Sequence, residues 1–187
     1  MTTKYIRIVG GTYRRTPIAV IDAPGLRPTP DRVRETLFNW LGHFWEGHFA
    51  DKRVLDLFAG SGALGFEAAS RGAAQVVLVE NDRRALQAMR DLREKLKAEA
   101  VRVQPGHALA ALRGPARYDL VFLDPPFGQG WLERLWPLLP AVLAPGALVY
   151  AEAEAPLPPP PAGFEILRQD KAGAVHYHLL QFAAPQE

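Results

Sequence analysis

The chain has no cysteine among its 187 residues. This absence excludes disulfide bonds, catalysis by a thiolate and zinc sites with cysteine ligands. The sequence also lacks an uninterrupted apolar run of membrane-spanning length, and its first residues, from Met1 to Arg15, are polar and basic rather than an apolar leader. Internal repeats are absent as well. We therefore expect a cytoplasmic protein that does not enter a membrane.

Histidine does not replace the missing cysteine ligands. Only five histidines occur, and of these only His176 and His178 would share one face of a strand. No acid or third histidine accompanies that pair, so we expect no metal site. With 187 residues, of which 48% are hydrophobic and 22% charged, the chain has the size and composition of one small globular domain. We expect it to be a monomer.

The most informative motif is Asp124-Pro125-Pro126-Phe127, which follows an apolar run at residues 120–123. An exocyclic amine is a poor nucleophile because its lone pair is delocalised into the adjoining π-system. Asp124 could accept one N–H of such an amine and the Pro125 carbonyl the other, which would aim the lone pair at a methyl donor. The two prolines stiffen the turn, and Phe127 offers a ring on which a flat target can stack. The motif indicates methyl transfer to a planar nitrogen, although a proline turn that merely ends a strand is the alternative for four residues alone.

A glycine-rich loop lies upstream of this motif, at residues 54–65. Its pattern is typical of a buried strand, a tight turn and the first turn of a helix, which together bring the backbone close to a nucleotide. Gly60 and Gly62 would supply unusual φ angles, and Gly65 would let the helix pack closely on the sheet. The residues of this loop that we expect to bind a cofactor are Asp56, Phe58, Ala59, Gly60, Ser61 and Gly62.

An acid ends the next expected strand. Glu80 lies twenty residues after Gly60, where a carboxylate can hold two ribose hydroxyls, and Asn81 follows it. The glycine spacing alone also fits an NAD-dependent enzyme. Asp56 argues against NAD, because an acid beside the loop would repel a pyrophosphate but suits a cationic sulfonium with an α-amino group. Although Asp56 could instead stabilise the start of a helix, the combined pattern favours S-adenosylmethionine as the ligand.

Strand and helix patterns alternate between residues 51 and 151, which is typical of βαβ units and a parallel sheet. Helices are predicted to start near residues 63, 82, 107 and 131. An earlier helix is predicted to begin with Thr29 as its N-cap and Pro30 in its first position. The expected strands are Arg53–Asp56, Gln75–Glu80, Val101–Val103, Leu120–Leu123 and Ala147–Ala151, followed by a hairpin of Phe164–Leu167 and Val175–Phe182.

Basic residues gather at the start of the chain. Residues 1–34 hold seven basic residues against two acidic ones, a local charge of +5, while the whole chain carries +2. Such asymmetry indicates contact with a polyanion, and arginine forks beside an aromatic ring suit nucleic acid. Solvated surface arginines are the alternative. The residues that we expect to contact RNA are Arg7, Tyr13, Arg14, Arg15, Arg27, Arg32 and Arg34.

Five segments together resemble the bacterial RsmD family of 16S rRNA guanine-N2 methyltransferases. They are Arg7–Gly11, Pro24–Leu41, Asp56–Gly65, Asp124–Phe127 and Lys171–Leu180, so the resemblance covers nearly the full length. The second segment is specific to this family, whereas the glycine loop and the Asp-Pro-Pro-Phe motif occur in many methyltransferases.

The resemblance implies an α/β, Rossmann-like methyltransferase fold. Its mostly parallel seven-stranded sheet would end in a C-terminal antiparallel hairpin. Residues 1–28 would form a basic β-hairpin extension that contacts RNA, and residues 29–187 would form the methyltransferase domain.

The resemblance also implies an activity. One guanine of 16S rRNA, in the small ribosomal subunit or its assembly intermediate, would be methylated on N2 with S-adenosylmethionine as donor. One position departs from the general methyltransferase pattern: after Gly106, where Asp or Asn often holds the adenine amino group, the chain has His107. The His107 imidazole or the Ala108 backbone N–H could meet the adenine edge instead.

Three other functions are compatible with parts of the sequence. An adenine-N6 methyltransferase would share the Asp-Pro-Pro-aromatic chemistry, but one acting on DNA would normally need a target-recognition domain, for which 187 residues leave no room. A glutamine-N5 protein methyltransferase typically has Asn in place of Asp124. A non-catalytic RNA-binding or assembly factor could keep the fold, but the intact Asp124 and glycine loop argue against a loss of catalysis.

Overall fold

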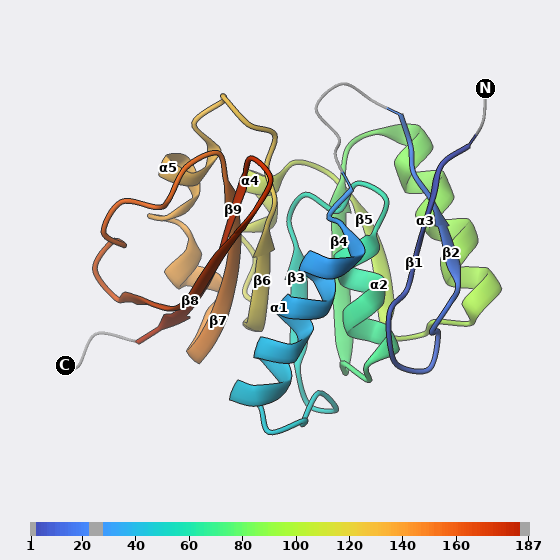
Figure 1. Cartoon of the computed structure of the whole chain (residues 1–187), viewed down its shortest axis with the longest axis horizontal. Coiled ribbons are helices and arrows are strands. Elements are labelled where there is room, and N and C mark those ends of the chain that lie inside the picture. Colours follow the sequence, from blue (N-terminus) through green and yellow to red (C-terminus); the bar gives the residue numbers. More distant parts are fainter. Residues whose placement is uncertain (1–2, 23–27, 184–187) are drawn as a thin grey trace.

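The computed structural model describes residues 3–22 and 28–183 of the chain (Figure 1). Two N-terminal strands form a small sheet, and the remaining strands form one large sheet flanked by helices. Within these described ranges, no helix is long and apolar enough to cross a membrane. The elements in chain order are β1 (Tyr5–Arg7), β2 (Pro17–Ala19), α1 (Asp31–Phe44), β3 (Arg53–Asp56), α2 (Ala63–Ser70), β4 (Gln75–Glu80), α3 (Arg83–Leu96), β5 (Val101–Pro105), α4 (Ala108–Ala111), β6 (Tyr118–Leu123), α5 (Trp131–Leu135), the 3-10 helix η1 (Leu139–Val142), β7 (Leu143–Ala153), β8 (Phe164–Ala172) and β9 (Val175–Phe182).

The large sheet has seven strands in the order β5-β4-β3-β6-β7-β9-β8. Strands β3 to β7 run parallel, while β9 is antiparallel to both β7 and β8. The expected seven-stranded sheet and its closing hairpin are confirmed, with β8 extending to Ala172 rather than ending at Leu167. The strand order reverses between β3 and β6. In open α/β sheets, ligands bind outside the carboxyl ends of the strands at such a switch point.

Alternate side chains of each central strand face opposite sides of the sheet. On β6, Leu120 and Phe122 belong to the core that α1, α2 and α3 cover. Val121 and Leu123 belong to the core that α4 and α5 cover. A strand covered on both faces is expected to be apolar at successive positions, which explains the continuous apolar run before Asp124. Figure 1 shows α1 and α2 in front of the strands.

The prediction that Thr29 caps the first helix was wrong. Helix α1 begins at Asp31 with Pro30 in the N-cap position, and no side chain caps it. The Thr29 hydroxyl donates instead to Oε1 of Glu152 over 3.1 Å, in a buried contact 123 residues away along the chain. A buried carboxylate needs such donors, and the bond joins the start of α1 to the end of β7.

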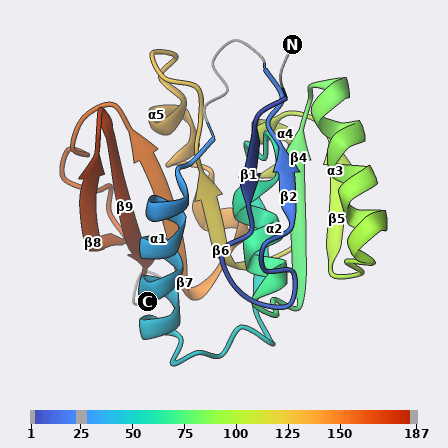
Figure 2. The same cartoon turned by 45° about the vertical axis from the view of Figure 1, so that its right-hand side comes forward.

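The N-terminal strands form the predicted hairpin, which lies against α2 (Figure 2). Glu67 of α2 accepts the backbone N–H groups of Val9 and Gly10 over 2.9 and 3.0 Å. Ile8 and Ile18 are buried in the same core cluster as α1 and α2. The hairpin is therefore fixed to the large sheet by both hydrogen bonds and apolar packing.

Candidate active site

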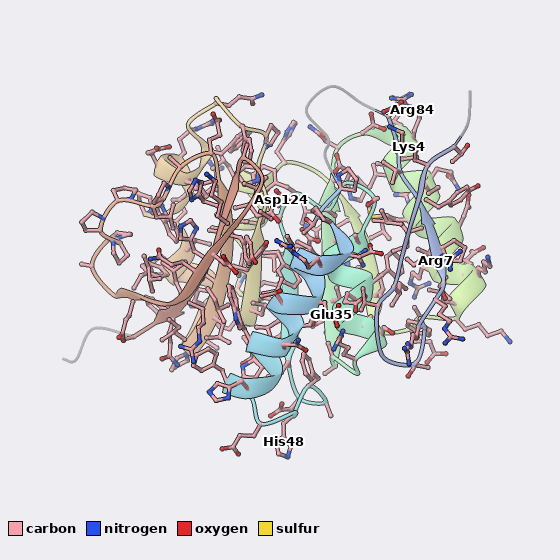
Figure 3. All side chains as sticks on the ribbon, in the orientation of Figure 1. Lys4, Arg7, Glu35, His48, Arg84 and Asp124 are labelled. Carbon is pink, nitrogen blue, oxygen red and sulfur yellow. The ribbon has the colours of Figure 1, made fainter. Side chains whose placement is uncertain are left out.

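A cleft of about 610 Å³ opens at the carboxyl ends of the parallel strands. Its walls come from the ends of β3 to β7 and the segments that follow them, together with residues 28–30 before α1. Figure 3 shows Asp124 at the end of β6. The cleft therefore lies at the switch point between β3 and β6.

The glycine loop adopts the predicted tight turn. Gly62 has a φ of 85°, and a Cβ there would lie 2.8 Å from the Phe66 ring. A Cβ on Gly65 would lie 2.0 Å from Cδ2 of Leu78, so glycine is what lets α2 approach β4 this closely. Gly62 shapes the turn without lining the cleft. The loop residues that do line it are Asp56, Leu57, Phe58, Ala59, Gly60, Ser61, Ala63 and Leu64.

Asp56 ends β3 and is only 1% exposed in the wall of the cleft. Within the described part of the chain, its Oδ1 has no hydrogen-bond partner. Burial raises the pKa of this carboxyl to about 7; the backbone N–H groups of Phe58 and Gly65 offset part of the rise, and the acids Glu80 and Glu152 add to it. An unpartnered buried carboxylate oxygen is costly. A cationic group of a ligand in the cleft would satisfy it.

Glu80 is fixed by backbone N–H groups on both of its carboxylate oxygens. Oε2 accepts from Gly60 over 2.8 Å. Oε1 accepts from Asn81 over 2.9 Å and from Asp82 over 3.0 Å. These bonds tie the end of β4 to the glycine loop. Because a carboxylate offers about four acceptor sites and three are occupied, Glu80 has about one site left for a ribose hydroxyl.

The predicted adenine-contacting residues line the neighbouring wall of the cleft. Nδ2 of Asn81 and Nδ1 of His107 lie 3.3 Å apart. Ala108 is buried at the start of α4. A backbone N–H in the first turn of a helix has no intrahelical acceptor, so the N–H of Ala108 suits a ring nitrogen of a ligand. The structure thus brings the ends of β4 and β5 together beside the glycine loop.

The Asp124–Phe127 motif lies in the same cleft as the glycine loop. Pro125 is buried, whereas Asp124, Pro126 and Phe127 are partly exposed. Although the residue as a whole is partly exposed, removal of its carboxyl group from water raises the pKa of Asp124 well above its ordinary range, and the carboxylates of Glu152 and Asp56 raise it further. The Thr29 hydroxyl offsets part of that rise. A predicted acceptor of amine hydrogens therefore faces the predicted donor site.

The sequence did not single out Glu152, a buried acid of β7 that also lines the cleft. Its Oε1 accepts the Tyr150 hydroxyl over 2.7 Å as well as that of Thr29. The sequence nevertheless contained a signal that could have identified Glu152 as a site residue. An acid directly after the expected strand 147–151 must lie at the same edge of a parallel sheet as Asp124.

A tryptophan that the sequence did not single out extends the aromatic wall of the cleft. The ring centroids of Phe58 and Trp131 lie 5.2 Å apart in an edge-on arrangement, and both residues line the cleft. The Arg134 guanidinium lies 4.5 Å from the centre of a Trp131 ring. Trp131 begins the short helix α5, and no recognisable motif surrounds it. Together with Phe127, these rings provide flat surfaces for planar ligands.

Several residues of the predicted RNA-contacting group are on the surface. Arg7, Arg14, Arg15 and Arg32 are exposed, and Tyr13 is half-buried against the core. Figure 3 shows Arg7 and Lys4 along the hairpin, to one side of Asp124. Arg27 lies outside the described residues.

The prediction that Arg34 contacts RNA was wrong. Its side chain is 0% exposed, and its guanidinium pairs with the Asp31 carboxylate. It also donates to the backbone carbonyls of Thr29 and Arg7 over 3.2 and 2.8 Å. Nη1 lies 3.6 Å from Oε2 of Glu67. Because these internal partners engage the guanidinium, its charge holds α1, α2 and the hairpin together.

Comparison with known proteins identifies the family. The family model described as Conserved hypothetical protein 95 matches residues 6–181. Ribosomal RNA small subunit methyltransferase D of Escherichia coli K12 is 46% identical over 187 residues, which cover 97% of this chain and 92% of that protein. The chain belongs to the RsmD family. A protein of the same name from Haemophilus influenzae is 39% identical and covers 94% of the chain.

Solved structures share the fold of this chain. A putative methyltransferase, yhhF, from Escherichia coli has a TM-score of 0.86 at 42% identity and covers 97% of this chain and all (100%) of that one. An RNA methyltransferase from Salinibacter ruber, in complex with S-adenosyl-L-homocysteine, has a TM-score of 0.64 at 18% identity, covers 86% of this chain and 97% of that one, and shows likeness of fold alone. The Rossmann-like methyltransferase fold expected from the sequence is confirmed.

Proposed function

We propose that this RsmD-family protein is an rRNA methyltransferase that transfers a methyl group from S-adenosylmethionine to N2 of a guanine in 16S rRNA of the small ribosomal subunit. Methylation of rRNA is supported by the names of relatives that match nearly the whole chain. One structural observation carries the chemistry: Asp124 lies in the same cleft as the anchored carboxylate of Glu80 and as the Asp56 carboxylate, whose Oδ1 has no hydrogen-bond partner among the described residues. A donor site and an acceptor of amine hydrogens therefore adjoin each other.

Three features of the chain would hold the donor. Asp56 offers a buried anion for the cationic amino acid part, and Glu80 offers its remaining acceptor site to a ribose hydroxyl. The Ala108 N–H and His107 border the space left for adenine. The bound donor would supply an electrophilic methyl group. A pyrophosphate cofactor such as NAD fits poorly, because the carboxylate of Asp56 would repel it.

The acceptor amine would be oriented by Asp124 and the backbone carbonyl of Pro125. Each would accept one hydrogen of the amine, which draws the nitrogen towards tetrahedral geometry and frees its lone pair. Phe127 lies on the cleft and offers a face for the base. A base in an RNA loop can enter such a cleft at little unstacking cost. The choice of guanine N2 over adenine N6 rests on the chain's membership of the RsmD family.

The RNA would lie along the basic N-terminal segment. Residues 1–28 would provide the RNA-contacting extension and residues 29–187 the methyltransferase domain. The exposure of Arg7, Arg14 and Arg15 on or beside the hairpin supports this role, as does that of Arg32 at the start of α1. Arginine forks bind phosphate through paired hydrogen bonds.

The test is a transfer assay with the purified protein, labelled S-adenosylmethionine and separate acceptors: unmodified small subunits, free 16S rRNA, duplex DNA and a glutamine-bearing protein. Label recovered as N2-methylguanosine from the subunit or the free rRNA is the expected result. Label in N6-methyladenine, or only in DNA or protein, would contradict the proposal. An absence of label despite donor binding would favour the non-catalytic assembly factor.

A further inference from the structure

Glu152 is a buried acid that lines the cleft. The residues proposed to hold the donor and to orient the amine do not include it. Strands β6 and β7 run parallel with Leu123 opposite Ala151, so Asp124 and Glu152 each follow a paired residue. Both acids line the cleft, and Glu152 raises the pKa of Asp124 both by its charge and through a side-chain hydrogen bond. Two carboxyl groups in such contact tend to share one proton, because ionising both places like charges side by side.

Glu152 accepts two hydroxyl hydrogen bonds in the wall of the cleft. Tyr150 and Thr29 both donate to its Oε1, over 2.7 and 3.1 Å. Burial, together with the charge of Glu152, raises the pKa of the Tyr150 hydroxyl well above its ordinary value, which keeps that hydroxyl a donor. Burial and the neighbouring Glu152 carboxylate raise the pKa of Asp124 well above its ordinary range, so Asp124 is the member of the pair that holds a proton.

We propose that Glu152 is a positioning residue that acts through Asp124 and makes the pair the acceptor of the proton that the amine loses on methylation. This inference rests on the proposed function. The lone pair of the amine nitrogen forms the new N–C bond while the C–S bond of the donor breaks and leaves its electron pair on sulfur. The nitrogen, now cationic, then gives one proton to the ionised Asp124 carboxylate, which leaves a neutral methylated amine.

The anion of Glu152 gives Asp124 a greater affinity for that proton. An isolated carboxylate is a weak base, and a general base works best when its pKa lies near the working pH. Asp124 must be ionised before it can accept, so the rate of transfer should rise with pH through the pKa of the pair. A cationic donor beside Asp56 would favour this ionised state.

The groups around Asp124 come from several elements. Asp56 ends β3, and Glu152 lies on β7. Thr29 precedes α1 and is the hydroxyl that lowers the pKa of Asp124. Tyr150 lies on β7 beside Glu152, and Tyr177 on β9 adds to the rise in the pKa of Tyr150. Replacing Glu152 by Gln removes one anion from this set and keeps nearly the same side-chain shape.

The experiment measures single-turnover transfer to unmodified small subunits at saturating S-adenosylmethionine, over a range of about pH 5 to 9. For Glu152→Gln, the acid limb of the rate profile should move to lower pH by about one unit or more, because the pKa of Asp124 falls. The plateau rate should fall about 10- to 100-fold, because Asp124 becomes a weaker base. Donor affinity, measured by calorimetry, should change by less than about threefold.

Two further variants separate charge from structure. Glu152→Asp retains the charge, so its acid limb should stay near the wild-type position even if the rate falls. Glu165→Gln makes the same chemical change at an exposed acid of β8 and should leave the profile unchanged. A Glu152→Gln variant whose rate falls while its acid limb stays in place would assign Glu152 a merely structural role and overturn the inference.

Infrared difference spectroscopy keeps the inference testable if Glu152→Gln does not fold. The free wild-type protein should show a protonated carboxyl band near neutral pH that is missing from Asp124→Asn. A spectrum without that difference would overturn the inference. Wild-type protein that transfers no methyl group to rRNA would instead contradict the proposed function, whereas an active wild type with an unmoved Glu152→Gln profile contradicts this inference alone.

Discussion

Nη1 of Arg34 and Oε2 of Glu67 lie 3.6 Å apart, and both side chains are completely buried. Glu67 also accepts hydrogen bonds from Nη2 of Arg71 and from the backbone N–H of Val9, each over 2.9 Å. Removing two charges from water costs several kcal/mol, so such a pair needs these additional hydrogen bonds. The pair holds α1 and the N-terminal hairpin against α2.

Arg34→Ala should lower the free energy of unfolding by about 3–5 kcal/mol, because Glu67 loses a buried partner. Arg32→Ala, at an exposed position of the same helix, should change it by no more than about 0.5 kcal/mol. Urea unfolding of both variants measures the difference. Equal effects would show that the buried pair contributes nothing particular to stability.

Gly65→Ala tests the close approach of α2 to β4. The new Cβ would lie 2.0 Å from Cδ2 of Leu78 and 3.1 Å from Cγ1 of Val76, so the free energy of unfolding should fall by about 1–3 kcal/mol. Gly42→Ala, within α1, places its Cβ with no described atom within 4 Å beyond its chain neighbours and the backbone of its own helix. That variant should gain about 0.5–1 kcal/mol. Urea unfolding should therefore give opposite signs for the two variants, and a shared sign would contradict the packing argument.

Asp56→Asn should stabilise the protein at alkaline pH. The pKa of Asp56 is about 7 in the folded protein against an ordinary value of 3.8. Its contribution to stability is thus fully present below about pH 4 and is lost as pH rises through 7. Asparagine removes this loss, so at about pH 8 the variant should be more stable than wild type by up to about 4 kcal/mol. Urea unfolding at about pH 4 and about pH 8 measures this change in stability. Asp51→Asn, at a side chain 77% exposed, should not show it.

Donor binding should respond to Asp56 in the opposite direction. A cationic donor binds the ionised carboxylate, so wild-type affinity for S-adenosylmethionine should rise up to about tenfold per pH unit as pH approaches 7. Asp56→Asn should weaken binding and abolish this pH dependence. Calorimetry between about pH 4 and about pH 8 measures the affinity of both proteins for S-adenosylmethionine. A variant that binds as tightly as wild type would remove Asp56 from the donor site.

Exposed arginines of the hairpin segment should contribute to RNA affinity. Arg7→Gln and Arg14→Gln should each weaken binding to 16S rRNA and reduce the slope of log affinity against log salt by about 1. Arg117→Gln changes an exposed arginine just before β6, at the end of the sheet opposite the cleft, and should leave the slope unaltered. Filter binding at several salt concentrations reports all three slopes. Unaltered slopes in both hairpin variants would place the RNA elsewhere.

The strands that carry the donor residues were predictable from the sequence. The bounds Arg53–Asp56 and Gln75–Glu80 match β3 and β4 because apolar runs between loops mark buried parallel strands. Their last residues then lie at one edge of the sheet by geometry alone. The position of Asp124 was predictable in the same way, since it directly follows the apolar run of β6.

Contacts between distant elements were not predictable in the same way. Thr29 has the residue type of an N-cap, but its hydroxyl bonds Glu152 on β7. Arg34 precedes the buried Leu37 and Leu41 by three and seven residues, which is the spacing of a buried helical face. The charge of Arg34 instead favoured a position on the surface. Its partner Glu67 belongs to another helix, and the local sequence does not identify such a partner.

We expect Asp124 to prepare a planar amine for methyl transfer in the cleft that binds the donor. The decisive measurement is of N2-methylguanosine in 16S rRNA after unmodified small subunits are incubated with S-adenosylmethionine and either wild type or Asp124→Ala, with donor affinity measured for both proteins. Wild type should produce N2-methylguanosine, and the variant should be slower by at least about 100-fold while its donor affinity changes only a few-fold. A variant that methylates at the wild-type rate, or that loses donor affinity in parallel with activity, would contradict this role for Asp124.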